Sequence, residues 1–270
     1  MDRKEMAKET LAILERGFYE AEGRRVPVRE TLERSVRESV LITPEEGVAI
    51  LKKYEIKKAC PQPETRVENL SVVEAVRRLS REGKTEIGVL NFASAKNPGG
   101  GFLNGAKAQE ETLTVSSTLY PTLTAHEEYY QKNRAHRSMM YLDYGIYSPD
   151  VLLIRDGTLK LTGTPVTASV LTLPAVNMGQ VRLKGENEEE ARRVMRRRMK
   201  LALGIFAEHG AKRLVLGAYG CGVFRNDPKD IAAWWRELLA EGMGACFETI
   251  YQAVLDNSKD GRCIRAFLNT

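Results

Sequence analysis

The feature that most constrains the fold of this chain is a regular alternation of β-rich runs with helix-length amphipathic segments. The β-rich runs stand at residues 65–71, 85–94, 165–176, 212–220 and 247–257. Helical patterns lie between or after them, at residues 72–83, 186–209 and 227–242. Strands separated by helices of this length predict a mostly parallel or mixed central sheet with helices on both faces. We therefore expect an α/β fold.

The first 60 residues differ from the rest, because helical signals dominate them. Apolar residues recur at helical spacing within residues 4–22, namely Met6, Leu11, Leu14 and Phe18. Thr43 before Pro44 predicts the cap and first turn of another helix. No Gly/Ser-rich linker follows. We expect residues 1–60 to form a mostly helical N-terminal extension, packed on a main domain over residues 61–270.

The cysteines and the apolar runs limit the possible location and cofactors. Cys60, Cys221, Cys246 and Cys263 form no CxxC pair and have no histidine at ligand spacing. This argues against a structural zinc site and a disulfide framework, so we expect no metal and no cofactor. The charged N-terminus lacks the apolar core of a signal peptide, and no run approaches the roughly 18 apolar residues of a membrane span. We expect a cytoplasmic protein without membrane contact.

The long helical pattern at residues 186–209 contains "RRVMRRRMK", which invites a nucleic-acid interpretation. A solvated helix face is the better interpretation. Glu188 and Glu189 precede Arg192 and Arg193 by four residues, the favourable order for ion pairs along a helix. The net charge of +5 is also modest for this length. We do not expect direct binding to nucleic acid.

Two of the predicted strands run into glycine-rich loops. Residues 85–94 lead into "NPGGGFLNG", and residues 212–220 end in the loop "GAYGCGVFRNDP". Ligands of parallel α/β sheets bind beyond the carboxyl ends of the strands. Glycines let successive backbone N–H groups approach an anion closely, and a helix that begins after the loop adds its positive end. Two such loops would clamp a group such as a diphosphate. A P-loop is excluded because no GKS or GKT follows, and the triplet does not fit GxGxxG.

Two adjacent acids, Glu110 and Glu111, follow the first glycine loop. On a helix their side chains diverge by roughly 100°, so they cannot face each other across one glycosidic bond. A division of labour fits better, in which one acid protonates a leaving oxygen and the other holds sugar hydroxyls. A bound diphosphate and a neighbouring carboxylate would both raise the pKa of the proton donor. The alternative is a solvent-facing acidic first turn favoured by the helix dipole. That alternative does not explain the glycine triplet.

Three glycines, a spacer of seven residues and Gln-Glu-Glu together resemble the signature of the microbial-type poly(ADP-ribose) glycohydrolases, which have a macrodomain fold. The resemblance covers most of the chain, including the second glycine loop. It implies that Glu111 is the catalytic acid and that Glu110 fixes the ribose hydroxyls beside the scissile bond. It also implies a set of substrate-binding residues: Asn97, Gly99, Gly100, Gly101, Gln109, Gly220, Cys221, Gly222, Val223 and Phe224.

The activity implied by this resemblance is hydrolysis of the ribose–ribose O-glycosidic bonds of poly(ADP-ribose). The substrate would be poly(ADP-ribose) or another ADP-ribosylated macromolecule, cut from the chain end, and the product would be ADP-ribose. Two alternatives stay open. One is a hydrolase that removes single ADP-ribose units from protein or nucleic acid, and the other is a non-catalytic ADP-ribose-binding macrodomain. The double acid favours an enzyme over a binding module.

Overall fold

The computed structural model describes residues 2–55 and 61–269, so Cys60, one of the four cysteines discussed above, lies outside the described residues. The strands are β1 (Phe18–Ala21), β2 (Arg24–Pro27), β3 (Val40–Ile42), β4 (Glu64–Glu68), β5 (Ile87–Ala93), β6 (Gly145–Arg155), β7 (Leu161–Pro174), β8 (Arg213–Leu216) and β9 (Thr249–Ala253). The helices are α1 (Arg3–Arg16), α2 (Arg29–Glu38), α3 (Pro44–Lys53), α4 (Val72–Arg81), α5 (Gln109–Val115), α6 (Leu119–Thr124), α7 (Glu127–Ala135), α8 (Met178–Leu183), α9 (Glu188–Glu208), α10 (Pro228–Ala240) and α11 (Arg262–Leu268). Two short 3-10 turns are η1 (Phe102–Asn104) and η2 (Met243–Cys246).

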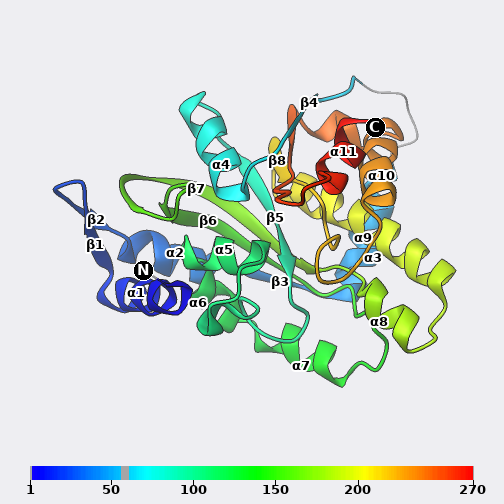
Figure 1. The fold of residues 1–270 in the computed structure, drawn as a ribbon, viewed down its shortest axis with the longest axis horizontal. Coiled ribbons are helices and arrows are strands. Elements are labelled where there is room, and N and C mark those ends of the chain that lie inside the picture. The colour runs from blue at the N-terminus through cyan, green and yellow to red at the C-terminus, as the bar shows by residue number, and fades with distance from the viewer. Residues whose placement is uncertain (1, 56–60, 270) are drawn as a thin grey trace.

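A seven-stranded mixed sheet lies at the centre of the molecule, in the order β3-β6-β7-β5-β8-β9-β4 (Figure 1). From β7 to β4 each neighbouring pair is parallel. The other side of the sheet is antiparallel, with β6 paired to both β3 and β7. The expected α/β fold with a mixed sheet is therefore confirmed. Because β5 and β8 are adjacent and parallel, their two following loops leave the same edge of the sheet.

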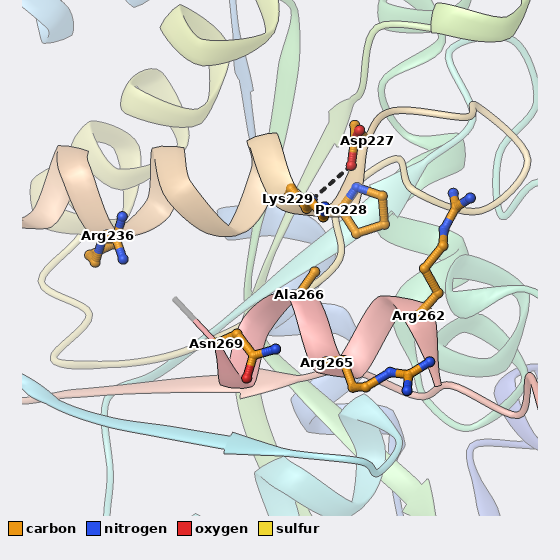
Figure 2. A pocket seen from close by; sticks show the side chains of 8 residues that line it. All are labelled: Asp227, Pro228, Lys229, Arg236, Arg262, Arg265, Ala266 and Asn269. Atoms are coloured by element: carbon orange, nitrogen blue, oxygen red, sulfur yellow. Dashed lines mark hydrogen bonds between the residues drawn. The ribbon is translucent and has the colours of Figure 1, made fainter. Parts of the chain in front are cut away.

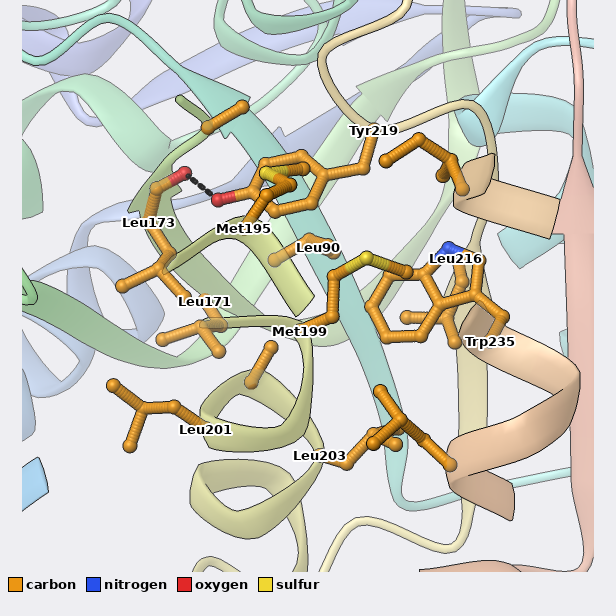
Figure 3. Close-up of a cluster of buried hydrophobic side chains, with 14 of the residues drawn as sticks. Leu90, Leu171, Leu173, Met195, Met199, Leu201, Leu203, Leu216, Tyr219 and Trp235 are labelled. Carbon is orange, nitrogen blue, oxygen red and sulfur yellow. Dashed lines mark hydrogen bonds between the residues drawn. The ribbon is translucent and has the colours of Figure 1, made fainter. Parts of the chain in front are cut away.

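Successive side chains of the central strands point to opposite faces and join two separate cores. In β5, Leu90 packs in one core with Met199 of α9 and Trp235 of α10. Its neighbour Val89 packs in the other core, which includes Val76 of α4. Figure 3 shows Met199 and Trp235 among the side chains of the first core. Helices cover both faces, as the strand–helix alternation predicted.

Local signals explain where several helices begin and end. Thr43 caps α3 in a capping box with Glu46, as predicted. Asp227 caps α10 and accepts a hydrogen bond from the Lys229 N–H. The helix expected at residues 4–22 is shorter, because Gly17 adopts a left-handed conformation with φ of 81° and ends α1. The following residues pair as the β1–β2 hairpin instead.

The N-terminal segment contributes to the central sheet as well as to its helical cover. β3 pairs with β6 at one edge of the sheet, and α3 packs against α9. A division of the chain into an extension over residues 1–60 and a domain over residues 61–270 stays a prediction.

The polar stretch at residues 114–150 contains α6, α7 and the beginning of β6. The sequence pattern does not predict β6, because the pairing of β6 with β7 shifts register between Ser148 and Val151. This irregularity includes Pro149 and Asp150, whose φ is 50°. A proline and a bulge interrupt the period-2 pattern by which a strand is recognised.

The arginines of α9 form ion pairs as expected of a solvated face, but with other partners. Arg192 pairs with Asp230 of α10 rather than with Glu188, and Arg193 pairs with Glu190 rather than with Glu189. Arg192 reaches Asp230 because α10 lies alongside α9, which spacing along one helix cannot reveal, whereas Arg193 pairs three residues back within α9. No described helix is long and apolar enough to cross a membrane.

Candidate active site

The side chain of Gln109 attaches the first turn of α5 to the carboxyl end of β5. Its Oε1 accepts a hydrogen bond from the Phe92 N–H at 2.9 Å, and its Nε2 donates to the Leu90 carbonyl at 2.8 Å. β8 pairs with β5 only over Ile87–Val89. The Gln109 amide thus acts as a strand partner beyond the point where β8 ends, and it fixes the direction in which the next two residues project.

Glu110 is buried beneath the first glycine loop, with 3% of its surface exposed. Its Oε1 accepts a hydrogen bond from Asn91 Nδ2 at 3.2 Å, and its Oε2 accepts one from the Ser94 N–H at 2.7 Å. Burial raises the pKa of Glu110 to about 8, although the two hydrogen bonds oppose that shift. Glu110 is therefore mostly protonated at neutral pH, so it does not place a full negative charge beside Glu111.

Glu111 differs from Glu110 because one of its oxygens has no protein partner. Its Oε1 accepts a hydrogen bond from the Gly101 N–H at 2.8 Å. Its Oε2 is buried and has no hydrogen-bond partner among the described residues. Buried polar atoms are nearly always hydrogen-bonded in folded proteins. An unsatisfied carboxyl oxygen at the carboxyl edge of a parallel sheet is thus available to a ligand.

The glycine triplet and the acid pair occupy the same small volume. A Cβ atom at Gly100 would lie 2.5 Å from Oε1 of Glu111 and 2.9 Å from Oε2 of Glu110. Gly99 and Gly100 also have positive φ values of 67° and 61°, which side chains rarely adopt. Only glycine lets this backbone pass over two carboxyl groups, so the loop needs the triplet because of the acids below it.

Helix α1 supports the first glycine loop from outside the sheet. Arg3 Nη2 donates to Thr112 Oγ1 at 3.4 Å, next to Glu111. Thr10 Oγ1 donates to the Val115 carbonyl at 2.7 Å, and Ala7 packs with Phe102 and Val115. A segment far from the site in sequence thus holds the middle and the C-terminal end of α5.

The second glycine loop owes its shape to crowding and to buried hydrogen bonds. A Cβ atom at Gly220 would lie 2.6 Å from Asn226 Nδ2. Asn226 Nδ2 in turn donates to the carbonyls of Val176 at 2.8 Å and Gly220 at 3.0 Å. Tyr219 OH donates to the Leu173 carbonyl at 2.9 Å, a bond drawn in Figure 3. These contacts attach the loop to the adjacent end of β7.

Ring contacts join the two glycine loops at their bases. The rings of Phe92, at the end of β5, and Tyr219, just after β8, are 5.5 Å apart. Buried Arg198 of α9 adds a further support, since it donates to the Pro174 carbonyl at 3.0 Å and to Asp143 at 2.8 Å. The carboxyl edge of β5, β7 and β8 is therefore a rigid platform that carries both loops.

Comparison with known proteins identifies the family. The family model for "Microbial-type PARG, catalytic domain" matches residues 7–156. A solved structure of poly(ADP-ribose) glycohydrolase (PARG) from Thermomonospora curvata is 38% identical, with a TM-score of 0.94, and the match covers 99% of this chain and 98% of that chain. This chain belongs to the microbial-type PARG family.

Two further PARG structures contain ligands. The Thermomonospora curvata PARG bound to the inhibitor ADP-HPD is 38% identical to this chain, with a TM-score of 0.92, and the match covers 99% of this chain and 98% of that one. The PARG from Deinococcus radiodurans in complex with ADP-ribose is 41% identical, with a TM-score of 0.83, and the match covers 88% of this chain and 96% of that one. No curated protein matched the chain.

The other predicted site residues of this microbial-type PARG vary in exposure. Asn97 is exposed and its carbonyl accepts a hydrogen bond from the Gly100 N–H at 3.0 Å. Gly222 has open space at its Cβ position, and Val223 is 80% exposed. Phe224 is partly buried, with its ring 6.0 Å from that of Tyr141. The second loop thus presents an exposed tip on a buried base.

Cys221 lies in the second loop as an uncharged thiol. Its Sγ donates to the Tyr219 carbonyl at 3.8 Å. The interaction with the Cys263 thiol of α11, together with burial, raises the pKa of the Cys221 thiol. A raised pKa disfavours the thiolate that a nucleophile needs. Among the described residues, no group of three or more His, Cys, Asp or Glu side chains could hold a metal ion.

Sequence reasoning missed three residues that shape this site, namely Asn91, Ser94 and Arg3. Asn91 offers a usable signal, since a fully buried asparagine inside an apolar strand needs a polar partner. Ser94 contributes its backbone N–H to Glu110, so its residue type gives no signal for that bond. Arg3 is 109 positions from Thr112, a pairing that no local pattern reveals.

Proposed function

We propose that this chain hydrolyses the ribose–ribose O-glycosidic bonds of poly(ADP-ribose) and releases ADP-ribose, with Glu111 as the general acid. The observation that carries this proposal is the asymmetry of the Glu111 carboxyl group. Oε1 is held by the Gly101 N–H, whereas Oε2 is buried and without a protein partner. Membership of the microbial-type PARG family supports the choice of substrate.

The chemistry follows from a carboxylic acid beside a sugar linkage. Glu111 donates a proton to the departing ribose oxygen, the C–O bond breaks, and a sugar with oxocarbenium character is captured by water. The proton taken from that water restores the acid.

Substrate binding is assigned to the two glycine loops. Gly99, Gly100 and Gly101 approach the diphosphate and the terminal ribose, near which Asn97 also lies. Gly220, Cys221, Gly222 and Val223 wrap the phosphates, and Phe224 packs on the distal ribose. Both oxygens of Glu110 already accept internal hydrogen bonds, so its contact to the ribose hydroxyls uses the remaining lone pairs or its proton. Gln109 acts on the substrate through the position of α5.

The mode of action and the location complete the proposal. We infer cleavage from the chain end, because a loop closed over the terminal ribose leaves no passage for internal units. A cytoplasmic location is supported by the cysteines, since Cys221, Cys246 and Cys263 form no disulfide among the described residues.

Removal of single ADP-ribose units from protein is the second candidate function, since the same pocket would serve it. A non-catalytic ADP-ribose reader is the third candidate. The unpartnered Oε2 of Glu111 favours catalysis over reading, because a binding module gains nothing from an unsatisfied buried carboxyl oxygen.

Release of free ADP-ribose from two substrates tests these candidates. Wild type, Glu111→Ala and Glu111→Gln are incubated with poly(ADP-ribose) and with mono-ADP-ribosylated protein. We expect wild type to release ADP-ribose from the polymer and both variants to lose at least about 10²-fold in rate while retaining ADP-ribose binding. Glu189→Gln, at an exposed position on α9, is the matched control and should keep the wild-type rate. Near-normal turnover by Glu111→Gln would show that Glu111 is not the general acid. Release of ADP-ribose from the mono-modified protein alone would favour the removal of single ADP-ribose units as the function.

A further inference from the structure

A basic pocket lies beside the second glycine loop, between helices α10 and α11. Its volume is about 710 Å³. It is lined by Asp227, Pro228, Lys229, Arg236, Arg262, Arg265, Ala266 and Asn269. Figure 2 shows Lys229 and Arg236 on α10 and Arg262 and Arg265 on α11. Four cationic side chains and a single carboxyl group therefore line this pocket, which is separate from the Glu110–Glu111 pair.

The cationic side chains of this pocket form fewer ion pairs than the charged side chains on the opposite side of α10. There, Asp230 pairs with Arg192, and Glu237 and Glu241 pair with Arg196 of α9. In contrast, no ion pair joins Lys229, Arg262 or Arg265 to any carboxylate of residues 2–55 or 61–269. All three are exposed. Asp227 caps α10 and has its Oδ1 engaged by the Lys229 N–H. The pocket thus carries a positive field that is open to solvent.

The pocket is continuous with the second glycine loop through both of its helices. Asp227 follows the loop directly, because Asn226 is the residue that closes it through its bonds to Gly220. On the other wall, Arg262 precedes Cys263, which packs against the same hydrophobic core as Cys221 of the loop. The second glycine loop therefore ends at the wall of the pocket, where Asp227 and Pro228 line it.

We propose that this pocket is a second anion-binding subsite for poly(ADP-ribose), which takes the diphosphate of an ADP-ribose unit other than the one held by the glycine loops. The proposal rests on the proposed function, because it assumes that the loops hold one unit of the polymer. Guanidinium groups match phosphate oxygens in a bidentate geometry, and each diphosphate brings two charges to a site that has few counter-charges of its own. A second subsite on one polymer benefits from high effective concentration, so a weak contact there raises the affinity for long chains without changing that for ADP-ribose.

Binding of ligands of different length tests the proposal in the non-hydrolysing Glu111→Ala background. The Kd values for ADP-ribose and for size-fractionated poly(ADP-ribose) are measured between 50 and 200 mM salt, with and without Arg262→Gln/Arg265→Gln. We expect the double substitution to weaken polymer binding about tenfold at the lower salt and to change ADP-ribose binding less than about twofold. The slope of log Kd against log salt should fall by about 1.4, since each lost phosphate contact removes about 0.7. Arg262→Lys/Arg265→Lys should retain that slope.

Matched controls keep the result interpretable. Arg24→Gln/Arg25→Gln removes two charges from the exposed β1–β2 hairpin at the opposite end of the molecule (Figure 1) and should leave polymer binding unchanged. An equal loss of affinity for ADP-ribose and polymer, or no loss for either, would overturn the proposal. A single-stranded oligonucleotide that competes as strongly as polymer, and only when Arg262 and Arg265 are present, would instead assign the pocket to nucleic acid. Failure of the wild type to hydrolyse polymer would refute the proposed function but would leave this binding test valid.

Discussion

At the scale of single residues, the site depends on one carboxyl group that is satisfied and one that is not. Both carboxyl oxygens of Glu110 accept hydrogen bonds, one from the Asn91 side chain and one from the Ser94 N–H. In Glu111, one buried oxygen has no hydrogen-bond partner among the described residues. Gly100 passes directly over both groups. These three adjacent features explain why a loop without side chains and a pair of acids occur within a few residues of each other.

Gly100→Ala should abolish most of the activity, because its Cβ would overlap the Glu111 carboxyl group at 2.5 Å and the residue would be strained at a φ of 61°. We expect a rate loss of about 10²-fold or more and destabilisation of about 2 to 4 kcal/mol. Gly83→Ala is the matched control. Gly83 has a φ of 71° but nothing within 4 Å of its Cβ position, so it reports the backbone cost alone, about 1 kcal/mol. Equal stability of the two variants in urea would show that the contact with Glu111 is not the cause.

Glu110→Gln should alter how stability depends on pH. In wild type, the unfolded chain loses the Glu110 proton near pH 4.5, while the folded chain keeps it until about pH 8. The folded state thus binds more protons between these values, and wild-type stability falls as pH rises, by at most about 1.4 kcal/mol per pH unit. Glutamine cannot ionise, so the difference in unfolding free energy between variant and wild type should rise from pH 5 to pH 8 and then level off. Urea unfolding at pH 5, 6, 7, 8 and 9 measures it, and a constant difference would contradict the buried, protonated state of Glu110.

At the scale of elements, α5 is a helix of seven residues that depends on its contacts more than on its own propensity. Its N-cap, Ala108, makes no side-chain cap bond. Gln109 instead fixes this uncapped end by bonding to the β5 backbone, and Thr10 of α1 bonds to the carbonyl at the other end of α5. The orientation of both acids is therefore set by neighbouring elements.

Gln109→Ala should separate positioning from direct substrate contact. It removes two hydrogen bonds to the β5 backbone, so we expect destabilisation of about 1 to 3 kcal/mol and a reduced kcat with little change in ADP-ribose affinity. Gln131→Ala, at an exposed position in α7, is the control for loss of a glutamine on a helix surface. A large loss of ADP-ribose binding with unchanged stability would show that Gln109 contacts the substrate directly.

At the scale of the whole molecule, the central sheet joins segments from distant parts of the chain, with β3 at one edge and β4 at the other. β4 and β9 pair although they lie far apart in sequence, and β3 of the N-terminal segment pairs with β6. The carboxyl edges of β5 and β8 then carry the two glycine loops, and α10 and α11 extend the second loop into the basic pocket. The carboxyl edge of β5, β7 and β8 thus carries the Glu110–Glu111 pair, and the basic pocket lies beside the second glycine loop.

The sequence by itself determined the strand–helix alternation, the two glycine loops and the acid pair, because these are local patterns of period, backbone freedom and spacing. Buried strands such as β5 and capped helices such as α3 and α10 were predictable for the same reason. β6 was not, since the bulge at Ser148 and Val151 breaks its period.

Only the tertiary structure decided which acid is buried, which oxygen is left free and which arginine of α9 is in the core. Glu110 and Glu111 have the same local signal, and their difference arises from Asn91, Ser94 and Gly101, which folding brings against them. Arg198 likewise looks like its exposed neighbours in sequence, yet it is fully buried. Burial and hydrogen bonding depend on contacts between segments distant along the chain, so they emerge only when the sheet is assembled.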